Sequence, residues 1–335
     1  MEDWRTDDWG IGGLLTIEFS IVSGSNESLL FGCLDSLHST MQGSPYAWTV
    51  TVTANANPGL GTRITSRFPT VAVIENETPR GFAANHNTVL GRSRARYVWL
   101  LNDDLVILPG AVSALTEYLE RPENSRVAVA SPKLLNPDGT LQPSTYGFPS
   151  MPQIMLAHSG LRESKIVTTL LRAVAPVLRS REGSSRFWAH DRIVEVDTFR
   201  GACVAMRMEA VRDVGLMVEV AQVGAEETEW HRRFHQRGWK VVYHPGAEVI
   251  HYGSQTVSGA SSSLLPEYLR GALYFFRVDR SPLSYRAFRS ALTAMFRARM
   301  ALQWLRRDSE GVAVSRRYLQ VTREGAAWSD RPLAP

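Results

Sequence analysis

Short apolar runs alternate with segments of helical apolar spacing over most of the chain. Runs rich in β-branched and aromatic residues predict strands at residues 14–22, 48–53, 71–74, 97–101, 127–130, 193–196, 239–243 and 248–250. Helical spacing or capping signals predict helices at residues 29–37, 81–94, 111–120, 208–214 and 225–237. Strands that alternate with helices in this way are typical of a mostly parallel, doubly wound α/β sheet.

The central stretch is residues 97–109, in which an apolar run ends abruptly in polar residues. Residues 97–101 read Tyr-Val-Trp-Leu-Leu, which suits a strand buried on both faces. Asn102, Asp103 and Asp104 follow directly. Adjacent carboxylates repel each other at the end of a buried strand, and a divalent cation would offset that repulsion. An acidic turn that leads into the helix after Pro109 explains the same residues, so both interpretations stay open.

A second acidic cluster opens the predicted helix at residues 225–237. Glu226, Glu227 and Glu229 fall in its first turn, and basic residues follow, as the helix dipole favours. Favourable charge placement alone would explain this pattern. His231 and His235 lie one turn apart and could share a metal, but no third ligand accompanies them, so an exposed helix face is the simpler interpretation.

The composition changes after residue 254. Residues 132–152 and 179–192 read as loops, the second as a mobile flap, and residues 154–178 as a helix. Residues 254–263 are rich in Ser and Gly and predict a flexible segment. Beyond them, residues 268–276 and 285–305 form two arginine-containing amphipathic segments, separated at Ser281-Pro282. We therefore expect one α/β domain over residues 1–260 and a basic helical region over residues 261–335.

Charge is unevenly distributed along the 335 residues. Residues 267–324 contain 12 Arg, 5 acidic residues and no Lys, which gives this segment a net charge of +7. The whole chain has a net charge of +4, so the remaining residues carry −3. The C-terminal helices therefore either pack with their arginines in water or contact an anionic membrane surface. Cys33 and Cys203 provide neither a disulfide framework nor zinc-ligand spacing. No secretory signal or membrane-spanning run is apparent, so we expect a cytoplasmic protein, peripheral to the membrane if the helices bind lipid.

Several motifs in a fixed order together resemble a known family. They are Gly81-Phe82-Ala83-Ala84-Asn85-His86-Asn87, Leu100-Leu101-Asn102-Asp103-Asp104, Val196-Asp197-Thr198-Phe199-Arg200-Gly201-Ala202, Glu226-Glu227-Thr228-Glu229, Gly238-Trp239, and the run from Tyr243 to His251. Each motif is weak alone, but their order and spacing over residues 14–254 resemble family 2 glycosyltransferases, in the branch of rhamnosyltransferase-like and galactofuranosyltransferase-like enzymes.

The resemblance implies a fold, a reaction and a site. The fold is the GT-A type, and the reaction moves a sugar, such as rhamnose or galactofuranose, from a nucleoside diphosphate to a hydroxyl acceptor with inversion. The acceptor would be a cell-surface polysaccharide or a lipid-linked glycan. Asp104 and His251 would hold Mg²⁺ or Mn²⁺, and Glu227 would be the catalytic base. The implied donor-binding residues are Ser23, Asn26, Asn55, Gly81, Phe82, Asn87, Asn102 and Asp103, and the implied acceptor-binding residues are Gly201, Glu226 and Glu229.

This sequence departs from the family pattern at three places. Ala54 stands where members usually carry an aspartate that helps hold the nucleotide base, Asn102 replaces the first aspartate of the metal motif, and Glu227 replaces an aspartate. These changes keep a second hypothesis open, namely a non-catalytic protein that binds a glycan or nucleotide. A nucleic-acid binder that uses the arginine-rich end is a third, weakened because no recognition module is visible.

Overall fold

The computed structural model describes residues 10–11, 14–24, 26–160, 190–199, 201–220, 226–253 and 261–328. The chain divides into two compact units. Unit 1 comprises Met1–Gly147, Arg186–Glu219 and Glu229–Thr256, and unit 2 comprises Phe148–Ser185, Val220–Thr228 and Val257–Pro335. Residues 179–189 of the predicted flap (179–192), the predicted helix beyond residue 160 and the Ser/Gly-rich residues 254–260 lie outside the described residues.

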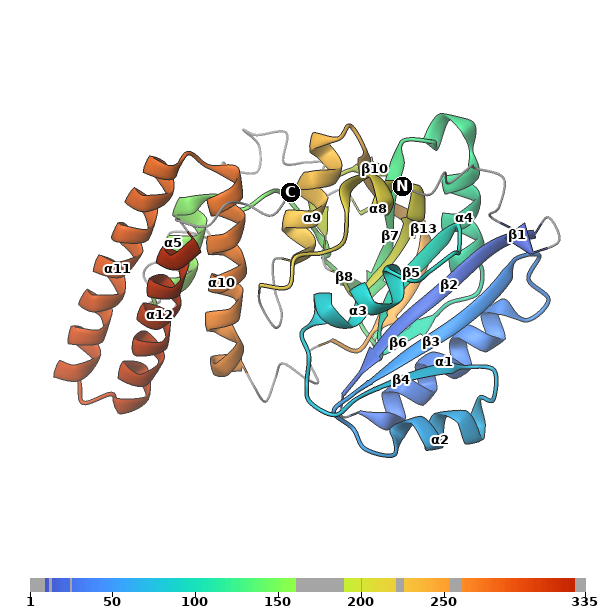
Figure 1. Ribbon diagram of the computed structural model, residues 1–335, viewed down its shortest axis with the longest axis horizontal. Helices are drawn as coiled ribbons and strands as arrows, with labels where there is room; N and C mark the ends of the chain where they lie inside the picture. Colours follow the sequence, from blue (N-terminus) through green and yellow to red (C-terminus); the bar gives the residue numbers. More distant parts are fainter. Residues whose placement is uncertain are drawn as a thin grey trace. The chain divides into compact units, whose positions relative to one another are not determined.

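Unit 1 is built on a large mixed sheet with the strand order β10-β13-β7-β12-β5-β2-β3-β4 (Figure 1). In chain order these strands are β2 (Leu14–Ser23), β3 (Ala47–Asn55), β4 (Ala72–Asn76), β5 (Tyr97–Asn102), β7 (Val127–Leu135), β10 (Val194–Glu195), β12 (Cys203–Arg207) and β13 (Lys240–His251). The short strands β1 (Gly10–Ile11), β6 (Leu105–Ile107) and β8 (Leu141–Gln142) pair with β2, β13 and β7, and β9 (Thr145–Tyr146) pairs with β11 (Thr198–Phe199) in a separate two-stranded sheet.

The sheet is mostly parallel on one side and mixed on the other. Strands β5, β2, β3 and β4 are mutually parallel, and β13 is parallel to β7. Strand β12 runs antiparallel between β5 and β7, so that Cys203 pairs with Leu101 at the end of β5. The mostly parallel α/β prediction is confirmed, but the direction of a five-residue buried strand cannot be predicted from its apolar pattern, which is the same for both directions.

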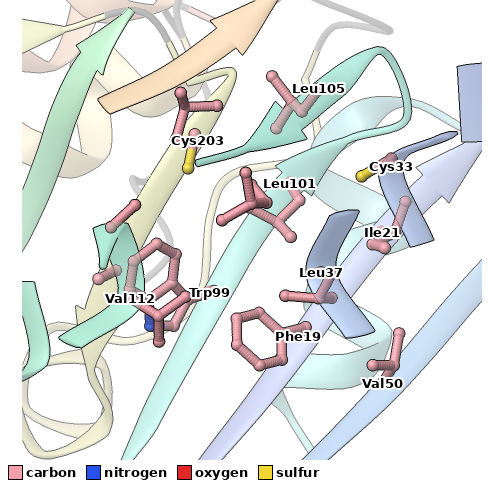
Figure 2. Packing of buried hydrophobic residues seen from close by; sticks show 14 of the residues in the cluster. Phe19, Ile21, Cys33, Leu37, Val50, Trp99, Leu101, Leu105, Val112 and Cys203 are labelled. Atoms are coloured by element: carbon pink, nitrogen blue, oxygen red, sulfur yellow. The ribbon is translucent and has the colours of Figure 1, made fainter. Parts of the chain in front are cut away.

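Strand β5 alternates its side chains between two cores. Trp99 and Leu101 belong to the core that includes Phe19, and Figure 2 shows them packed together with Leu37 of helix α1 (Glu27–Met41). Val98 and Leu100 belong to the core on the other face. The prediction of a strand buried on both faces is therefore confirmed.

Helices of unit 1 cover both faces of the sheet. The first core includes residues of α1 (Glu27–Met41), α2 (Leu60–Arg67) and α4 (Ala111–Glu120). The second core includes residues of α3 (Phe82–Leu90), α8 (Met208–Val214) and α9 (Glu226–Gln236), whose first three residues are assigned to unit 2. A 3₁₀ turn, η1 (Pro122–Asn124), follows α4.

The two strands predicted at residues 239–243 and 248–250 are one strand. β13 is continuous from Lys240 to His251, with a register shift against β7 between His244 and Glu248. The Pro245-Gly246 dipeptide, which reads as a break in the sequence, is accommodated at this irregularity.

Unit 2 is helical in its described part. It contains α5 (Met151–His158), α10 (Ser261–Asp279), α11 (Pro282–Leu305) and α12 (Ser309–Trp328). The break predicted at Ser281-Pro282 is confirmed, because the Ser281 side chain caps α11. A core of aromatic and aliphatic side chains joins these helices, with Phe296 stacked on Tyr318. Helix α12 lies in the region predicted to be helical, but its own bounds were not predicted.

The division into units differs from the predicted single boundary after residue 260. Residues 148–160 belong to unit 2, because Phe148 packs against Phe275 of α10 and Met151 and Ile154 pack on the same core. Among the described residues, no helix is long and apolar enough to cross a membrane.

Candidate active site

The carboxyl end of β5 gathers polar side chains from two parallel strands. β5 ends at Asn102 and β2 ends at Ser23, and the pairing of Val22 with Asn102 brings both ends to the same edge. The Ser23 hydroxyl donates a hydrogen bond of 2.7 Å to Asp103 Oδ2. Burial raises the pKa of Asp103 to about 6, and the Ser23 hydrogen bond opposes that shift while the charge of Asp104 adds to it. Ser23 therefore stabilises the ionised form of a carboxyl group that burial disfavours.

The end of β13 brings His251 to the same place. β13 pairs antiparallel with β6, so that His251 lies opposite Leu105, the residue after Asp104. The backbone N–H of Tyr252 donates to the carbonyl of Asp104 at 2.9 Å, which fixes the two segments together. The result is a distance of 3.2 Å between His251 Nε2 and Asp104 Oδ1, with both side chains largely buried. Asn102 Nδ2 lies 3.5 Å from the same ring nitrogen.

A glutamine sets the orientation of the His251 ring. Gln142 Oε1 lies 2.6 Å from His251 Nδ1. The Gln142 amide nitrogen donates to Asn136 Oδ1 at 3.0 Å and to the His251 carbonyl at 3.4 Å, so the amide oxygen must face the ring. Nδ1 therefore carries a proton, and in the neutral ring Nε2 presents its lone pair to Asp104.

This arrangement fits a divalent cation. Asp104 Oδ1 is buried and has no hydrogen-bond partner among the described residues. A carboxylate oxygen that faces an imidazole lone pair is stable only with a proton or a cation between them. Carboxylate oxygen and imidazole nitrogen are suitable ligands for Mn²⁺, and Mg²⁺ binds one or two carboxylates with water and phosphate completing its shell.

The described part of the chain contributes only this pair to such a site. No group of three or more His, Cys, Asp or Glu side chains that could hold a metal occurs among the described residues. The remaining ligands would come from a bound phosphate and water. The structure thus brings together Asp104 and His251 as the sequence suggested, while their role as metal ligands stays a prediction.

Helix α9 uses part of its acidic cluster internally. Arg233 Nε lies 3.0 Å from both oxygens of Glu229, and its other guanidinium nitrogens donate to the carbonyls of Val214 and Leu216. Burial raises the pKa of Glu229 and the charge of Arg233 opposes the shift. Glu229 is therefore accounted for as the partner of Arg233, and its acceptor-binding role has no support from these contacts. Glu226 is buried and Glu227 half-buried at the start of the helix, and the predicted role of Glu227 as base is untested.

Three predicted donor-binding asparagines have structural partners. Asn26 caps α1 through Leu29 N, and Asn55 holds both backbone groups of Arg80. The Asn87 amide bonds both backbone groups of Met217 and also the carboxylate of Glu219. These hydrogen bonds explain the asparagines without a ligand, so donor contact through their amides stays a prediction.

The predicted donor-binding residues Gly81 and Phe82 lie at the start of α3, and the predicted acceptor-binding residue Gly201 lies next to β12. Gly81 caps α3, and Phe82 packs edge-on against His86 in the next turn at a ring distance of 4.4 Å. Gly201 lies in the turn before β12, and Arg200 beside it is outside the described residues.

The two histidines of α9 have different hydrogen-bond partners. His231 Nδ1 lies 2.9 Å from Thr198 Oγ1, whereas His235 Nε2 lies 3.1 Å from the carbonyl of Val196. The interpretation as an exposed face was wrong for His231, which is 2% exposed. Burial lowers its pKa to about 3, so the ring is neutral in the folded protein.

Sequence reasoning missed Gln142 and Asn136. Gln142 lies in a segment rich in Pro, Gly and Ser, which was interpreted as loop, although Leu141 and Gln142 pair with β7. A polar residue in such a segment carries no signal of its own, because its partner His251 is distant in the sequence.

Comparisons with known proteins agree with this architecture. A sequence model described as "Glycosyltransferase like family 2" matches residues 61–268, more than half of the chain. Two strains of Mycobacterium tuberculosis, CDC 1551 / Oshkosh and ATCC 25618 / H37Rv, carry an N-acetylglucosaminyl-diphospho-decaprenol L-rhamnosyltransferase that is 24% identical over 240 residues, covering 66% of this chain and 71% of the relative.

Two solved structures share the fold. The mannosyltransferase PcManGT from Pyrobaculum calidifontis, in complex with GDP-Man and Mn²⁺, superimposes with a TM-score of 0.51 at 13% identity, over 94% of this chain and 88% of that one. GalNAc-T7, with UDP, GalNAc and Mn²⁺, gives a TM-score of 0.50 at 16% identity over 78% of this chain, which spans only 50% of that protein. Both are GT-A glycosyltransferases, so the expected fold is confirmed. With the family model matching most of unit 1, the chain belongs to the glycosyltransferase-like family 2.

Proposed function

We propose that the protein is a metal-dependent inverting glycosyltransferase that moves a sugar from a nucleoside diphosphate to an acceptor hydroxyl. The observation that carries the proposal is the buried pair of Asp104 and His251 at the carboxyl edge of the sheet, where Asp104 Oδ1 lies 3.2 Å from His251 Nε2 and has no hydrogen-bond partner among the described residues. Ligands of open α/β sheets bind at this edge. Mn²⁺ or Mg²⁺ held there would offset the negative charge that develops on the departing diphosphate.

The chain's own residues supply the remaining steps. Asp104 and His251 hold the site, Gln142 orients the ring of His251, and Ser23 keeps Asp103 in place. Glu227 accepts the proton of the acceptor hydroxyl. At the same time the hydroxyl oxygen forms a bond to the anomeric carbon of the donor sugar, and the bond from that carbon to the diphosphate breaks. General-base help of this kind contributes about 10²–10⁴-fold. Attack opposite the leaving group inverts the anomeric centre and needs no covalent intermediate.

The name of one relative supports a substrate class. The mycobacterial relative is named as a rhamnosyltransferase that acts on a diphospho-decaprenol-linked sugar. We propose rhamnose or galactofuranose as the transferred sugar and a lipid-linked or polysaccharide acceptor of the cell surface. We place the enzyme at the cytoplasmic membrane face, peripherally bound, where a lipid-linked acceptor would be reached.

A donor screen with the purified protein tests the proposal. Nucleotide sugars are added with and without Mn²⁺, and apparent thermal stability and donor turnover are measured, since a ligand that binds the folded state raises its stability. Glu227→Gln should bind the donor but lose turnover. Glu310→Gln, an exposed glutamate in the first turn of α12, is the matched control and should retain both. Equal turnover by Glu227→Gln would remove Glu227 as the base.

One observation favours a second function, a non-catalytic glycan or nucleotide binder. Ala54 is 1% exposed and lies in the core, so the position that carries a base-contacting aspartate in relatives offers no polar group. Its neighbour Asn55 is occupied with Arg80. Saturable nucleotide binding that ignores Mn²⁺ and never leads to turnover would support this alternative over the enzyme.

A further inference from the structure

The end of helix α11 carries exposed large apolar side chains. Leu302, Trp304 and Leu305 are 55%, 72% and 69% exposed. Earlier in the same helix Tyr285, Phe288, Leu292 and Phe296 are buried in the core of unit 2. One side of the last turns of α11 is therefore exposed, while Met300 on the same turns packs against the core of unit 2. Single exposed apolar residues are common, but three within four positions form a patch that needs an explanation.

The charge around this patch is mainly positive. Helix α11 contains four arginines and no acidic residue, and Arg306 and Arg307 follow it directly and are exposed. Arg316 and Arg317, on α12, are exposed as well. Asp308 and Glu310 are the nearby acidic residues, and Asp308 Oδ1 is used to accept a hydrogen bond from Gly311 N at the start of α12. The patch is thus apolar at its centre and basic at its rim.

This combination favours one occupant. A second copy of the chain would bring like-charged arginines face to face, which opposes association. An anionic bilayer attracts the arginines, while tryptophan and leucine lower their free energy by entering the interfacial region. Figure 1 shows that the turn between α11 and α12 lies at the opposite end of α11 from the turn after α10, so the patch sits at the tip of a helical hairpin.

We propose that this hairpin tip docks on an anionic lipid bilayer, with Leu302, Trp304 and Leu305 in the interface and Arg306 and Arg307 at the headgroups. The contact is independent of the transfer reaction, so it holds or fails separately from the proposed enzyme activity. Because part of the attraction is between exposed charges, binding weakens as salt is raised.

Co-sedimentation of the full chain with vesicles of phosphatidylglycerol and phosphatidylcholine tests the proposal. The wild type should sediment at low salt, and less with vesicles of phosphatidylcholine alone. The double variant Trp304→Ser/Leu305→Ser should partition at least about tenfold more weakly, and Arg306→Gln/Arg307→Gln should lose most of the dependence on salt and anionic lipid. Leu283→Ser is the matched control, because Leu283 is 79% exposed but lies at the other end of α11.

Four results would overturn the proposal. The first is a wild type that stays in solution with vesicles at low salt, and the second is a Trp304→Ser/Leu305→Ser variant that sediments like the wild type. The third is a Leu283→Ser variant whose sedimentation is reduced as much as that of Trp304→Ser/Leu305→Ser. The fourth is a wild type that is a dimer without lipid and that Trp304→Ser/Leu305→Ser converts to a monomer. The last would assign the patch to contact between copies. Thermal unfolding of each variant checks that unit 2 stays folded, and donor turnover in solution checks that the site in unit 1 is intact.

Discussion

Asp104 and Glu229 are both buried carboxylates, with 9% and 4% exposure, but their surroundings are opposite. Glu229 has a guanidinium at 3.0 Å from each oxygen, so its charge is compensated by the protein. Asp104 Oδ1 instead faces Nε2 of His251, whose Nδ1 is hydrogen-bonded to Gln142. A buried carboxylate that the protein pairs indicates structure, whereas one that the protein leaves uncompensated indicates a site for something not encoded in the chain.

The largest expected effect is at Asp104. Asp104→Asn removes the charge but leaves an amide that can donate to His251 Nε2. We expect donor turnover to fall by about 10³-fold, while the free energy of unfolding without metal is unchanged or higher. Mn²⁺ titration followed by electron paramagnetic resonance should show the loss of binding. An active Asp104→Asn enzyme, or one that still binds Mn²⁺ like the wild type, would remove the contrast with Glu229.

The next effect is at the partner of Glu229. Arg233→Met leaves the Glu229 carboxylate buried without its cation and also removes donors to two carbonyls, so we expect a loss of about 3 kcal/mol in unfolding free energy. Arg232→Met is the comparison variant on the same helix, since the Arg232 guanidinium donates to Gln236 Oε1 at 3.2 Å in an exposed hydrogen bond, and it should cost about 0.5 kcal/mol. Urea denaturation measures both. Equal losses would show that Arg233 acts through helix packing rather than through Glu229.

The role of Gln142 sharpens the comparison further. Gln142→Met removes the acceptor of His251 Nδ1–H, and we expect Mn²⁺ affinity to fall roughly 10- to 100-fold. Gln142→Glu keeps an acceptor at that position and should retain most of the affinity. Nitrogen-15 NMR of the histidine ring in the metal-free protein should report the Nδ1–H form in the wild type. If the wild type, Gln142→Met and Gln142→Glu bind Mn²⁺ with the same affinity, Gln142 does not tune the metal site and only stabilises the β7–β8 turn.

The smallest expected effect is on the pH dependence of stability at His86, a buried group that, unlike Asp104 and Glu229, is kept neutral. His86 is buried beside Ser20, and burial lowers its pKa to about 3. Below pH 6.5 the unfolded chain binds a proton that the folded protein does not, so stability is fully present above pH 6.5 and falls as the pH drops toward 3. We expect His86→Gln to reduce this fall by about 1 kcal/mol per pH unit, measured by urea denaturation between pH 6 and pH 4. The same pH dependence in both proteins would mean that His86 is protonated in the folded state.

The apolar pattern predicted much of unit 1 but not how its strands pair. The alternation of Trp99 and Leu101 with Val98 and Leu100 between two cores follows from the period of a strand, which a sequence displays directly. The antiparallel direction of β12 and the pairing of β13 with β6 do not, because strand partners are chosen by packing among distant segments. The bounds of α12 within the predicted helical region were missed for a related reason: its apolar side is completed by residues of α10 and α11.

By itself, the sequence determined the order of strands and helices, the position of Asn102, Asp103 and Asp104 after the central strand, and the basic character of the C-terminal helices. These depend on local periodicity and composition, which neighbouring residues express. The family resemblance suggested that His251 meets Asp104, but only the tertiary structure gave their 3.2 Å approach. It alone decided that Gln142 orients the ring, that Glu229 is already paired, and that Trp304 is exposed while Phe296 is buried. Each of these is a relation between residues whose distance along the chain says nothing about their distance in space, since it depends on how the sheet and the helical unit close.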